Sequence, residues 1–365
     1  MATPGISGET GIMGLEDFAA ALEWQARHAE ENGAPATARV IRALAGVRAS
    51  DTATGRRIAG WEGLTLKDAL PLRLAGGLHH LVLSGADDRL AQVYAGQMTD
   101  QAAVDALVLD LAQRFDAELL PWLDGPPQTN EAGRAASIMA GLLWLAQRVR
   151  APHFDLFELG ASAGVNTMLD RYFFRLGETD VGPADSPMRI VPEWRGASPP
   201  APSAGFAIAQ VKGCDIAPID LSDPDSALRL KAYVWPDAPA RLERIDAAIA
   251  LARQQPPDLI AADAGDFASN MLDRPPQPGT ARVMFHSIMW QYLPAATQQR
   301  ITAAFEAAGA QATLEAPIGW VALETDPATF RHELTVRLWD GAGAHGAPEL
   351  LAFAHPHGAW VEWLP

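Results

Sequence analysis

The stretch FDLFELGASAGVN, residues 154–166, joins an apolar run to a turn built from small residues. A short run of this kind, rich in phenylalanine and leucine, is typical of a buried β-strand. The run ends at Gly160, where the chain can turn sharply, and small side chains continue to Gly164. We therefore predict a strand, a tight turn that lets a ligand approach the backbone, and a helix that begins at Gly164.

The chain around this stretch changes character at Pro152. Upstream, residues 1–127 show helical periodicity, with a first helix from Leu15 that stops at Gly33 and a second that opens at Pro35. Downstream, runs of β-forming residues alternate with amphipathic helices, which is typical of parallel sheets. The predicted strands are FDLFEL, MRIVPEW, DLIAADA, ARVMFHSI, ATLEAPIGWVALE, LTVRLWD and LLAFAHPHGAWVEWL.

These elements predict an α/β fold. We expect a doubly wound, mainly parallel, seven-stranded Rossmann-like sheet over residues 128–365, with an antiparallel pair at its C-terminal end. An α-helical N-terminal region over residues 1–127 precedes it, and the segment at about 176–205, rich in proline and glycine, is expected to form an insertion over one edge.

Composition narrows the class of protein. The 365 residues are 48% hydrophobic, enough to bury a core, and Cys214 is the single cysteine, so no disulfide forms within the chain. The net charge of −16 repels nucleic acid and anionic lipid. The sequence shows no signal-peptide pattern at its start and no apolar window of membrane-span length. We expect a cytoplasmic protein that binds a small-molecule substrate, with no nucleic-acid and no membrane partner.

One interpretation of the turn makes Ser162 a nucleophile. Gly160-x-Ser162-x-Gly164 matches the nucleophile elbow of α/β-hydrolases, in which the serine attacks an ester. That fold places several strands and an oxyanion loop such as His-Gly-Gly before the elbow, whereas the preceding residues here are predicted to be helical and contain no such loop. Downstream histidines are available as a base, so the hydrolase hypothesis stays open. These histidines are His345, His355 and His357.

Two nucleotide-binding fingerprints do not fit the turn. A nicotinamide site requires Gly-x-Gly-x-x-Gly, but Ser162 and Val165 occupy the second and third glycine positions. The chain also lacks the Gly-Lys-Ser/Thr sequence of a phosphate-binding loop.

Longer motifs surround the turn in a fixed order. FELGASAGVN…DRYFF, with QTNEAGR before it and DPD…VWPD, FHSIMWQYLP and HPHGAWVEWL after it, resembles the bacterial family called domain of unknown function 2332 over residues 70–365. That family carries no established reaction. The segment Glu-x-Gly-Ala-Ser-Ala-Gly in turn resembles class I methyltransferases, with serine in place of the middle glycine. This second resemblance implies S-adenosylmethionine as cofactor and methyl transfer to a small molecule. A non-catalytic binding protein is the third hypothesis.

The resemblance to methyltransferases implies contacts for the cofactor. Glu158 accepts from its ammonium group, an acidic residue at the end of the second strand holds the ribose, and an aspartate after the third strand faces the adenine. Glu193 is the candidate for the ribose, and Asp263 for the adenine with Asp266 in reserve. A solvated strand end and a helix cap are the alternatives for Glu193 and Asp263. The expected cofactor-binding residues are Glu158, Gly160, Ala161, Ser162, Gly164, Asn166, Glu193 and Asp263.

The end of the fourth predicted strand, FHSIMWQYLP, faces the transferred methyl group in this scheme. His286 is the candidate general base near neutral pH, and a structural histidine is the alternative. The expected residues on the substrate side are His286 and Tyr292, assigned as catalytic, with Ser287 and Gln291 as pocket residues.

Geometry adds a further set of pocket residues. A helix over residues 130–150 that turns directly into the strand at 154–159 runs antiparallel to that strand. The helix is about 30 Å long and the strand about 20 Å, so the helix start should overhang the glycine turn. The expected pocket residues are Gln128, Thr129, Asn130, Glu131 and Arg134, with Arg171 after the turn. A plain N-cap at Thr129 or Asn130 is the alternative. His355-Pro-His357 has chelating spacing, but no cysteine or glutamate completes a site, so we expect no metal.

Overall fold

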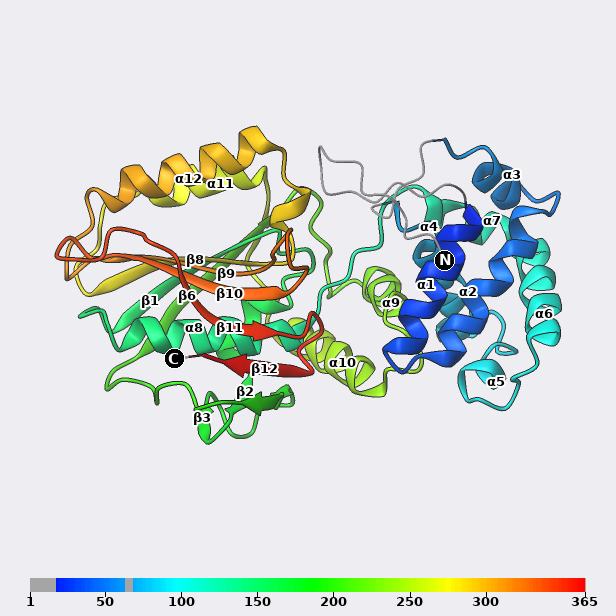
Figure 1. Ribbon diagram of the computed structural model, residues 1–365, viewed down its shortest axis with the longest axis horizontal. Coiled ribbons are helices and arrows are strands. Elements are labelled where there is room, and N and C mark those ends of the chain that lie inside the picture. Colours follow the sequence, from blue (N-terminus) through cyan, green and yellow to red (C-terminus); the bar gives the residue numbers. More distant parts are fainter. Residues whose placement is uncertain (1–17, 63–67, 365) are drawn as a thin grey trace. The chain divides into compact units, whose positions relative to one another are not determined.

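The computed structural model describes residues 18–62 and 68–364 and divides the chain into two compact units. The helical unit comprises residues 1–129 and 223–243, and the sheet unit comprises residues 130–222 and 244–365. The sequence predicted a single boundary, between residues 127 and 128. Leu15, the predicted start of the first helix, lies outside the described residues. Figure 1 labels the α-helices and most of the strands.

The helical unit buries the apolar faces of its helices in one main core, besides a smaller cluster of Trp122, Ala232 and Tyr233. Apolar side chains of α1, α2, α4 and α6 form most of the main core. The α-helices are α1 (Phe18–Glu31), α2 (Pro35–Arg48), α3 (Ala53–Ala59), α4 (Leu70–Leu83), α5 (Ala91–Tyr94), α6 (Gln101–Arg114), α7 (Asp116–Leu119) and α9 (Pro224–Ala232), and a 3-10 helix, η2 (Leu120–Leu123), follows α7.

A residue far away in the sequence caps α2. The helix begins at Pro35 after Ala34, whose side chain cannot accept a hydrogen bond from the free amides of the first turn. Asp237 supplies the missing acceptor, because its carboxylate takes hydrogen bonds from Ala36 N at 2.6 Å and from Thr37 N at 3.2 Å. This cap explains why residues 223–243 fold with the helical unit.

Removing this cap should destabilise the helical unit. We expect Asp237→Ala to lower the free energy of unfolding by about 1–2 kcal/mol, because two amides of the first turn lose their acceptor. Urea unfolding followed by far-ultraviolet circular dichroism measures the change. The exposed Asp88 makes no side-chain cap, and Asp88→Ala should change the same quantity by less than about 0.5 kcal/mol. Equal effects of the two substitutions would contradict the capping role.

The sheet unit is built around β1 (His153–Leu159), the strand predicted from FDLFEL. It pairs in parallel with β6 (Ala207–Asp215) on one side and with β8 (Thr280–Ser287) on the other. Next to these lie β7 (Leu259–Ala261) and β9 (Ile318–Thr325), also parallel. The order β7-β6-β1-β8-β9 means that the chain winds outward in both directions from β1, so the switch point lies between β1 and β8.

Four further strands extend the sheet beyond β9, so the prediction of seven strands is wrong. β10 (His332–Trp339), β11 (Glu349–Ala354) and β12 (Trp360–Trp363) form an antiparallel meander, and β5 (Glu193–Arg195) pairs with β12, which gives nine strands. No helix separates β9 from β10, because Asp326 accepts from the amides of Ala328 and Thr329 and turns the chain back at once.

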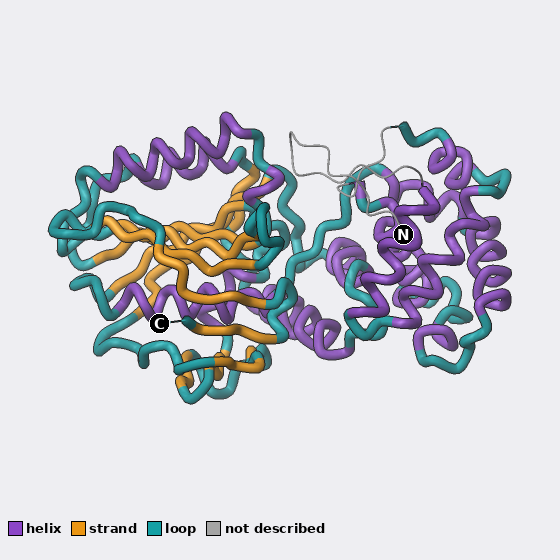
Figure 2. Tube along the Cα trace, in the orientation of Figure 1, coloured by secondary structure: helices purple, strands orange, loops and turns teal. Residues whose placement is uncertain are grey.

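Helices cover both faces of the sheet, as Figure 2 shows. On one face lie α11 (Ala264–Leu272) and α12 (Ala295–Gly309), with Phe157, Phe305 and Trp320 in the shared core. On the other face α8 (Ala135–Ala146), buried at every position, packs mainly against β9 and β10. A further helix, α10 (Pro239–Gln254), precedes β7.

The prediction that MRIVPEW is the second parallel strand is wrong. Pro192 interrupts this segment and divides it into β4 (Arg189–Ile190) and β5, because proline cannot donate to a sheet ladder. β4 joins β2 (Phe173–Leu176) and β3 (Thr179–Val181) in a separate three-stranded sheet. The second parallel strand is therefore β6, and it ends at Asp215.

Candidate functional site

The turn after β1 holds three residues in left-handed backbone conformations. The φ angles are +65° at Gly160, +53° at Ser162 and +70° at Gly164. A side chain on Gly160 would meet the Met289 side chain at 2.9 Å, and Ala161 N donates to Cys214 O at 2.8 Å, which fixes the turn between its two neighbours in the sheet. A serine in this conformation is strained, and such strain is concentrated at functional sites.

The α-helix predicted to begin at Gly164 is absent. A six-residue 3-10 helix, η4 (Asn166–Arg171), follows the turn and leads directly into β2. Thr167 Oγ1 donates to Gly164 O at 2.7 Å, so the local side chain competes with an α-helical start. The predicted positive end of an α-helix at this position is therefore wrong.

Polar atoms without hydrogen-bond partners gather at the turn. Glu158, Ser162 and Asn166 are 2%, 9% and 1% exposed. Across the described residues, Glu158 Oε2, Ser162 Oγ and both amide atoms of Asn166 find no partner. Burial raises the pKa of Glu158 well above its usual value. The Asn166 amide, which is near Glu158 but outside hydrogen-bond geometry, and the Arg134 guanidinium offset this only in part. Buried polar atoms are almost always satisfied by a protein group, a water or a ligand, so this cluster marks a binding position.

The raised pKa of Glu158 predicts a pH dependence of stability. As pH rises above 4.5, the ordinary pKa of this group, the unfolded chain loses the proton before the folded protein does, so Glu158 progressively destabilises the fold. Glu158→Gln removes this effect. Its free energy of unfolding relative to wild type should therefore increase with pH, by up to about 1–3 kcal/mol. Urea unfolding at several pH values measures the trend. Glu178→Gln, at an exposed position, should show no trend, and a pH-independent difference for Glu158→Gln would contradict the burial argument.

Asp215 occupies the end of the second parallel strand, where Glu193 was expected. Asp215 Oδ2 accepts from Ser162 N at 2.8 Å, and Oδ1 accepts from Ala217 N at 2.9 Å. The next side chain, Ile216, is 81% exposed. Glu193 instead lies on β5 at the opposite edge of the sheet, where it pairs with Arg195 at 2.8 Å. Asp215 could have been found from its position at the end of the segment AIAQVKGCD. The polar residues in that segment, however, kept it from being predicted as a strand.

Residues before α8 reach the same edge of the sheet. Asn130 Oδ1 accepts from Val165 N at 2.8 Å, and Arg134 Nη1 donates to Ser287 O, the last residue of β8, at 3.3 Å. The predicted helix over residues 130–150 is shorter in the structure, because α8 spans only Ala135–Ala146. A 3-10 turn, η3 (Ala132–Arg134), precedes it, and the Glu131 side chain caps this turn by accepting from Gly133 N. Gln128 and Thr129 belong to the helical unit.

The remaining predicted cofactor and pocket residues have structural partners or lie at the surface. Asp263 caps α11 through Gly265 N at 2.9 Å and pairs with Arg300, which also binds Asp266 at 3.0 Å. Arg171 donates to Gln255 O at 2.6 Å. Gln291 and Tyr292 are exposed, Tyr292 by 61%.

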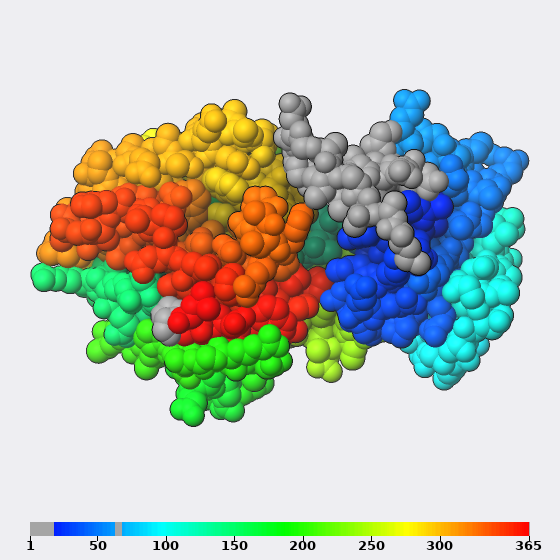
Figure 3. Space-filling model, viewed as in Figure 1, coloured from blue at the N-terminus to red at the C-terminus, as the bar shows by residue number. Residues whose placement is uncertain are grey.

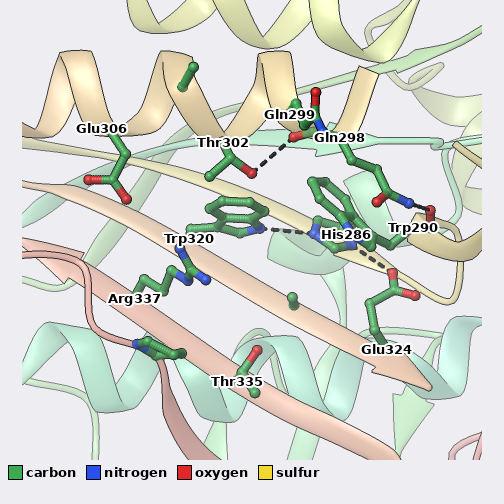
Figure 4. A pocket seen from close by; sticks show the side chains of 13 residues that line it. His286, Trp290, Gln298, Gln299, Thr302, Glu306, Trp320, Glu324, Thr335 and Arg337 are labelled. Carbon is green, nitrogen blue, oxygen red and sulfur yellow. Dashed lines mark hydrogen bonds and ion pairs between the residues drawn. The ribbon is translucent and has the colours of Figure 1, made fainter. Parts of the chain in front are cut away.

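His286 takes part in a network on the α12 face of the sheet (Figure 4). Its Nδ1 lies 2.6 Å from Glu324 Oε1, and Trp320 Nε1 donates to its Nε2 at 2.9 Å. Because an indole nitrogen only donates, Nε2 must carry a lone pair, and the proton of the neutral ring lies on Nδ1. His286 therefore has to leave Trp320 before Nε2 can accept a proton as a general base.

The same network forms one wall of a cavity of about 730 Å³. Trp290 stacks on His286 with ring centres 5.2 Å apart. Sequence reasoning missed Glu324, since a glutamate at the end of a strand resembles a solvated residue. The cavity is lined by His286, Trp290, Gln298, Gln299, Thr302, Ala303, Glu306, Trp320, Ala322, Glu324, Thr335, Arg337 and Pro348.

The described part of the chain contains no group of three or more His, Cys, Asp or Glu side chains arranged to hold a metal ion. No helix within residues 18–62 and 68–364 has the length and apolar character that a membrane crossing requires.

Together, the winding of the strands and the polar turn define a doubly wound α/β protein with a candidate ligand site at the carboxyl end of its central strand. The family described as "Uncharacterized protein conserved in bacteria (DUF2332)" matches residues 19–363, and the chain belongs to this family. This match confirms the first resemblance drawn from the motifs and extends it over both units. No curated protein and no solved structure matches the chain.

Proposed function

We propose that this protein transfers a methyl group from S-adenosylmethionine to a small molecule. The observation that carries the proposal is the set of buried polar atoms without partners at the carboxyl end of β1, on Glu158, Ser162 and Asn166. Ligands of doubly wound sheets bind at the carboxyl ends of the strands beside the switch point, and β1 borders that point here. A ligand with an ammonium group and several hydroxyl groups matches the chemistry of these atoms.

The side chains at this edge suit the parts of S-adenosylmethionine. The buried Glu158 carboxyl is a strong acceptor for the ammonium group, and Arg134 brings a positive charge close to it that favours the carboxylate. Asp215 ends the second strand, and its carboxylate oxygens have lone pairs left for ribose hydroxyls after they accept from Ser162 and Ala217. The exposed side chain of Ile216 offers an apolar surface for the adenine ring.

When bound, the cofactor would supply the electrophilic methyl group. The contribution of the chain is to hold and orient the reactants and to exclude water, because in-line attack needs positioning more than acid–base chemistry. Such a reaction does not need His286 as a general base. Both ring nitrogens of His286 already make hydrogen bonds, one with Glu324 and one with Trp320.

A hydrolase is the second candidate, and the conformation of Ser162 favours it. A nucleophile elbow also holds its serine in a strained turn, and Ser162 has a φ of +53°. Its Oγ has no hydrogen-bond partner in the described residues, whereas a nucleophilic serine needs a base within reach. Labelling by a fluorophosphonate that is lost in Ser162→Ala would support the hydrolase.

Thermal unfolding with a panel of ligands tests the proposal. S-adenosylmethionine and S-adenosylhomocysteine should each raise the unfolding temperature, because a ligand that binds only the folded state stabilises it. NAD and ATP serve as comparators that share the adenosine part. No shift with the first two ligands would contradict the proposal, and a shift with only NAD or ATP would favour a non-catalytic nucleotide-binding protein.

A further inference from the structure

The cavity beside His286 has aromatic walls at the end nearest the glycine turn. The rings of Trp290 and Trp320 are 5.4 Å apart, and both contact the His286 ring, at 5.2 and 6.0 Å (Figure 4). A volume of about 730 Å³ is large enough to hold a small organic molecule, and the cavity is partly open to solvent. Trp320 stacks on Phe305 at 4.4 Å and has Arg337 over its ring at 5.1 Å. The partly exposed Trp290 is therefore the ring that can hold an apolar body or attract a cation.

A carboxylate in the wall of the cavity has one oxygen without a partner. Glu324 Oε1 accepts from His286 Nδ1 and from Met289 N at 3.1 Å. Its Oε2 is buried and has no partner in the described residues. Because leaving a buried carboxylate oxygen unsatisfied is costly, this position favours a ligand that donates a hydrogen bond, and a positively charged donor most of all.

The charges along the cavity are separated. Arg337 lies opposite Trp320 in the register of β9 and β10, and Glu324 is four residues further along β9, which is about 13 Å. Figure 4 shows Glu306 and Arg337 at one end of the cavity and Glu324 at the other. The Arg337 guanidinium lies over the Trp320 ring, 5.1 Å from its centre, so its charge is held at the end of the cavity away from Glu324.

Met289 connects this end of the cavity to the glycine turn. Its amide donates to Glu324, and its side chain packs where a side chain on Gly160 would lie. β9 is two strands from β1 in the sheet, about 10 Å away. Figure 3 shows α12 and the chain from β10 to β12 side by side on one face of the sheet unit, and the cavity lies between these segments.

We infer that the Glu324 end of this cavity binds a protonated amine with an apolar or aromatic body. The ammonium group donates to Glu324 Oε2, and the body lies against Trp290. That this amine is the methyl acceptor rests on the proposed function. In that reaction the ammonium proton passes to Glu324, the nitrogen lone pair forms the new N–C bond, and the sulfonium C–S bond breaks with its electron pair kept by sulfur.

Calorimetric titration of the full chain, without S-adenosylmethionine, tests the site. The probes are 2-phenylethylamine, 2-phenylethanol and 3-phenylpropanoate, which share an aromatic body and differ in charge. We expect the amine to bind at least about tenfold more tightly than either of the others, since a charged hydrogen bond is the stronger kind. Equal binding of the three probes, or no binding of the amine, would overturn the inference.

Substitutions identify the residue that causes the preference for the amine. Glu324→Gln should remove the preference for the amine and leave the affinity for 2-phenylethanol unchanged. Glu306→Gln removes the same charge at the far end of the cavity and should keep the preference. Retention of the preference in Glu324→Gln would overturn the assignment of Oε2. Ala322→Leu keeps the carboxylate and fills the space beside it, so it should abolish amine binding and serves if Glu324→Gln does not fold. Because these titrations contain no cofactor, loss of the proposed function would leave their outcome unchanged.

Discussion

Glu158→Ala is expected to weaken binding of S-adenosylmethionine by about 10- to 100-fold, the range for losing a hydrogen bond to a charged group. The side chain is 2% exposed at the end of the central strand, and its Oε2 has no partner among the described residues. A bound ammonium group would satisfy that oxygen and favour the ionised carboxyl, which burial otherwise disfavours. The substitution removes both effects, and calorimetric titration of wild type and variant measures them.

Glu193 provides the matched control for this substitution. It was the other glutamate expected to contact the cofactor, but it lies exposed on β5 at the opposite edge of the sheet and pairs with Arg195. We expect Glu193→Ala to leave the affinity for S-adenosylmethionine unchanged. Equal affinity losses in the two variants, or an unchanged affinity in Glu158→Ala, would contradict the placement of the ligand at the end of β1.

Gly358→Ala is expected to lower the free energy of unfolding of the sheet unit by about 2–4 kcal/mol, from overpacking and from left-handed strain. Gly358 lies between β11 and β12 with a φ of +71°, and a side chain there would overlap the backbone of Gly133. Neither backbone can move easily, because Gly133 lies in the 3-10 turn that leads into α8 and Gly358 N donates to His355 O at 2.9 Å. Urea unfolding followed by circular dichroism measures the loss.

Two other glycines separate the two causes of this loss. Gly279 also has a positive φ, +81°, but open space around it, so Gly279→Ala should cost only about 1 kcal/mol from the backbone. Gly343 has open space and no positive φ, and its alanine variant should be within about 0.5 kcal/mol of wild type. If Gly358→Ala cost no more than Gly279→Ala, the close crossing with Gly133 would not matter for stability. The crossing also positions the adjacent Arg134, whose Nε donates to Pro356 O at 2.9 Å.

The sequence predicted the strands that are encoded by short, continuous apolar runs. FDLFEL and ARVMFHSI are apolar runs buried by neighbours on both sides, and they became β1 and β8. The second parallel strand escaped prediction because Gln210, Lys212 and Gly213 interrupt the apolar residues of β6, whose first positions are exposed or only partly buried. The nine-stranded sheet depends on pairings between distant segments, which local patterns do not specify.

The candidate site, like the fold, could be predicted only where local sequence patterns determine it. Glu158 and the glycine turn could be found because the carboxyl end of a central strand is fixed by the strand itself. Asp215 depended on finding β6, and the role of Glu324 depends on the pairing of β8 with β9, which places it beside His286. The helix expected after Gly164 failed because side chains of η4 bond to the local backbone and β-forming residues follow at once.

Photochemical cross-linking of tritiated S-adenosylmethionine, followed by peptide mapping, tests the central claim most directly. The label should appear in peptides that contain residues 154–172 or 207–217, which carry the glycine turn and Asp215. Excess S-adenosylhomocysteine should prevent it, and Glu158→Ala should reduce it strongly. Absence of label in the folded protein, or label confined to peptides outside the sheet unit, would contradict a cofactor site at the carboxyl end of β1.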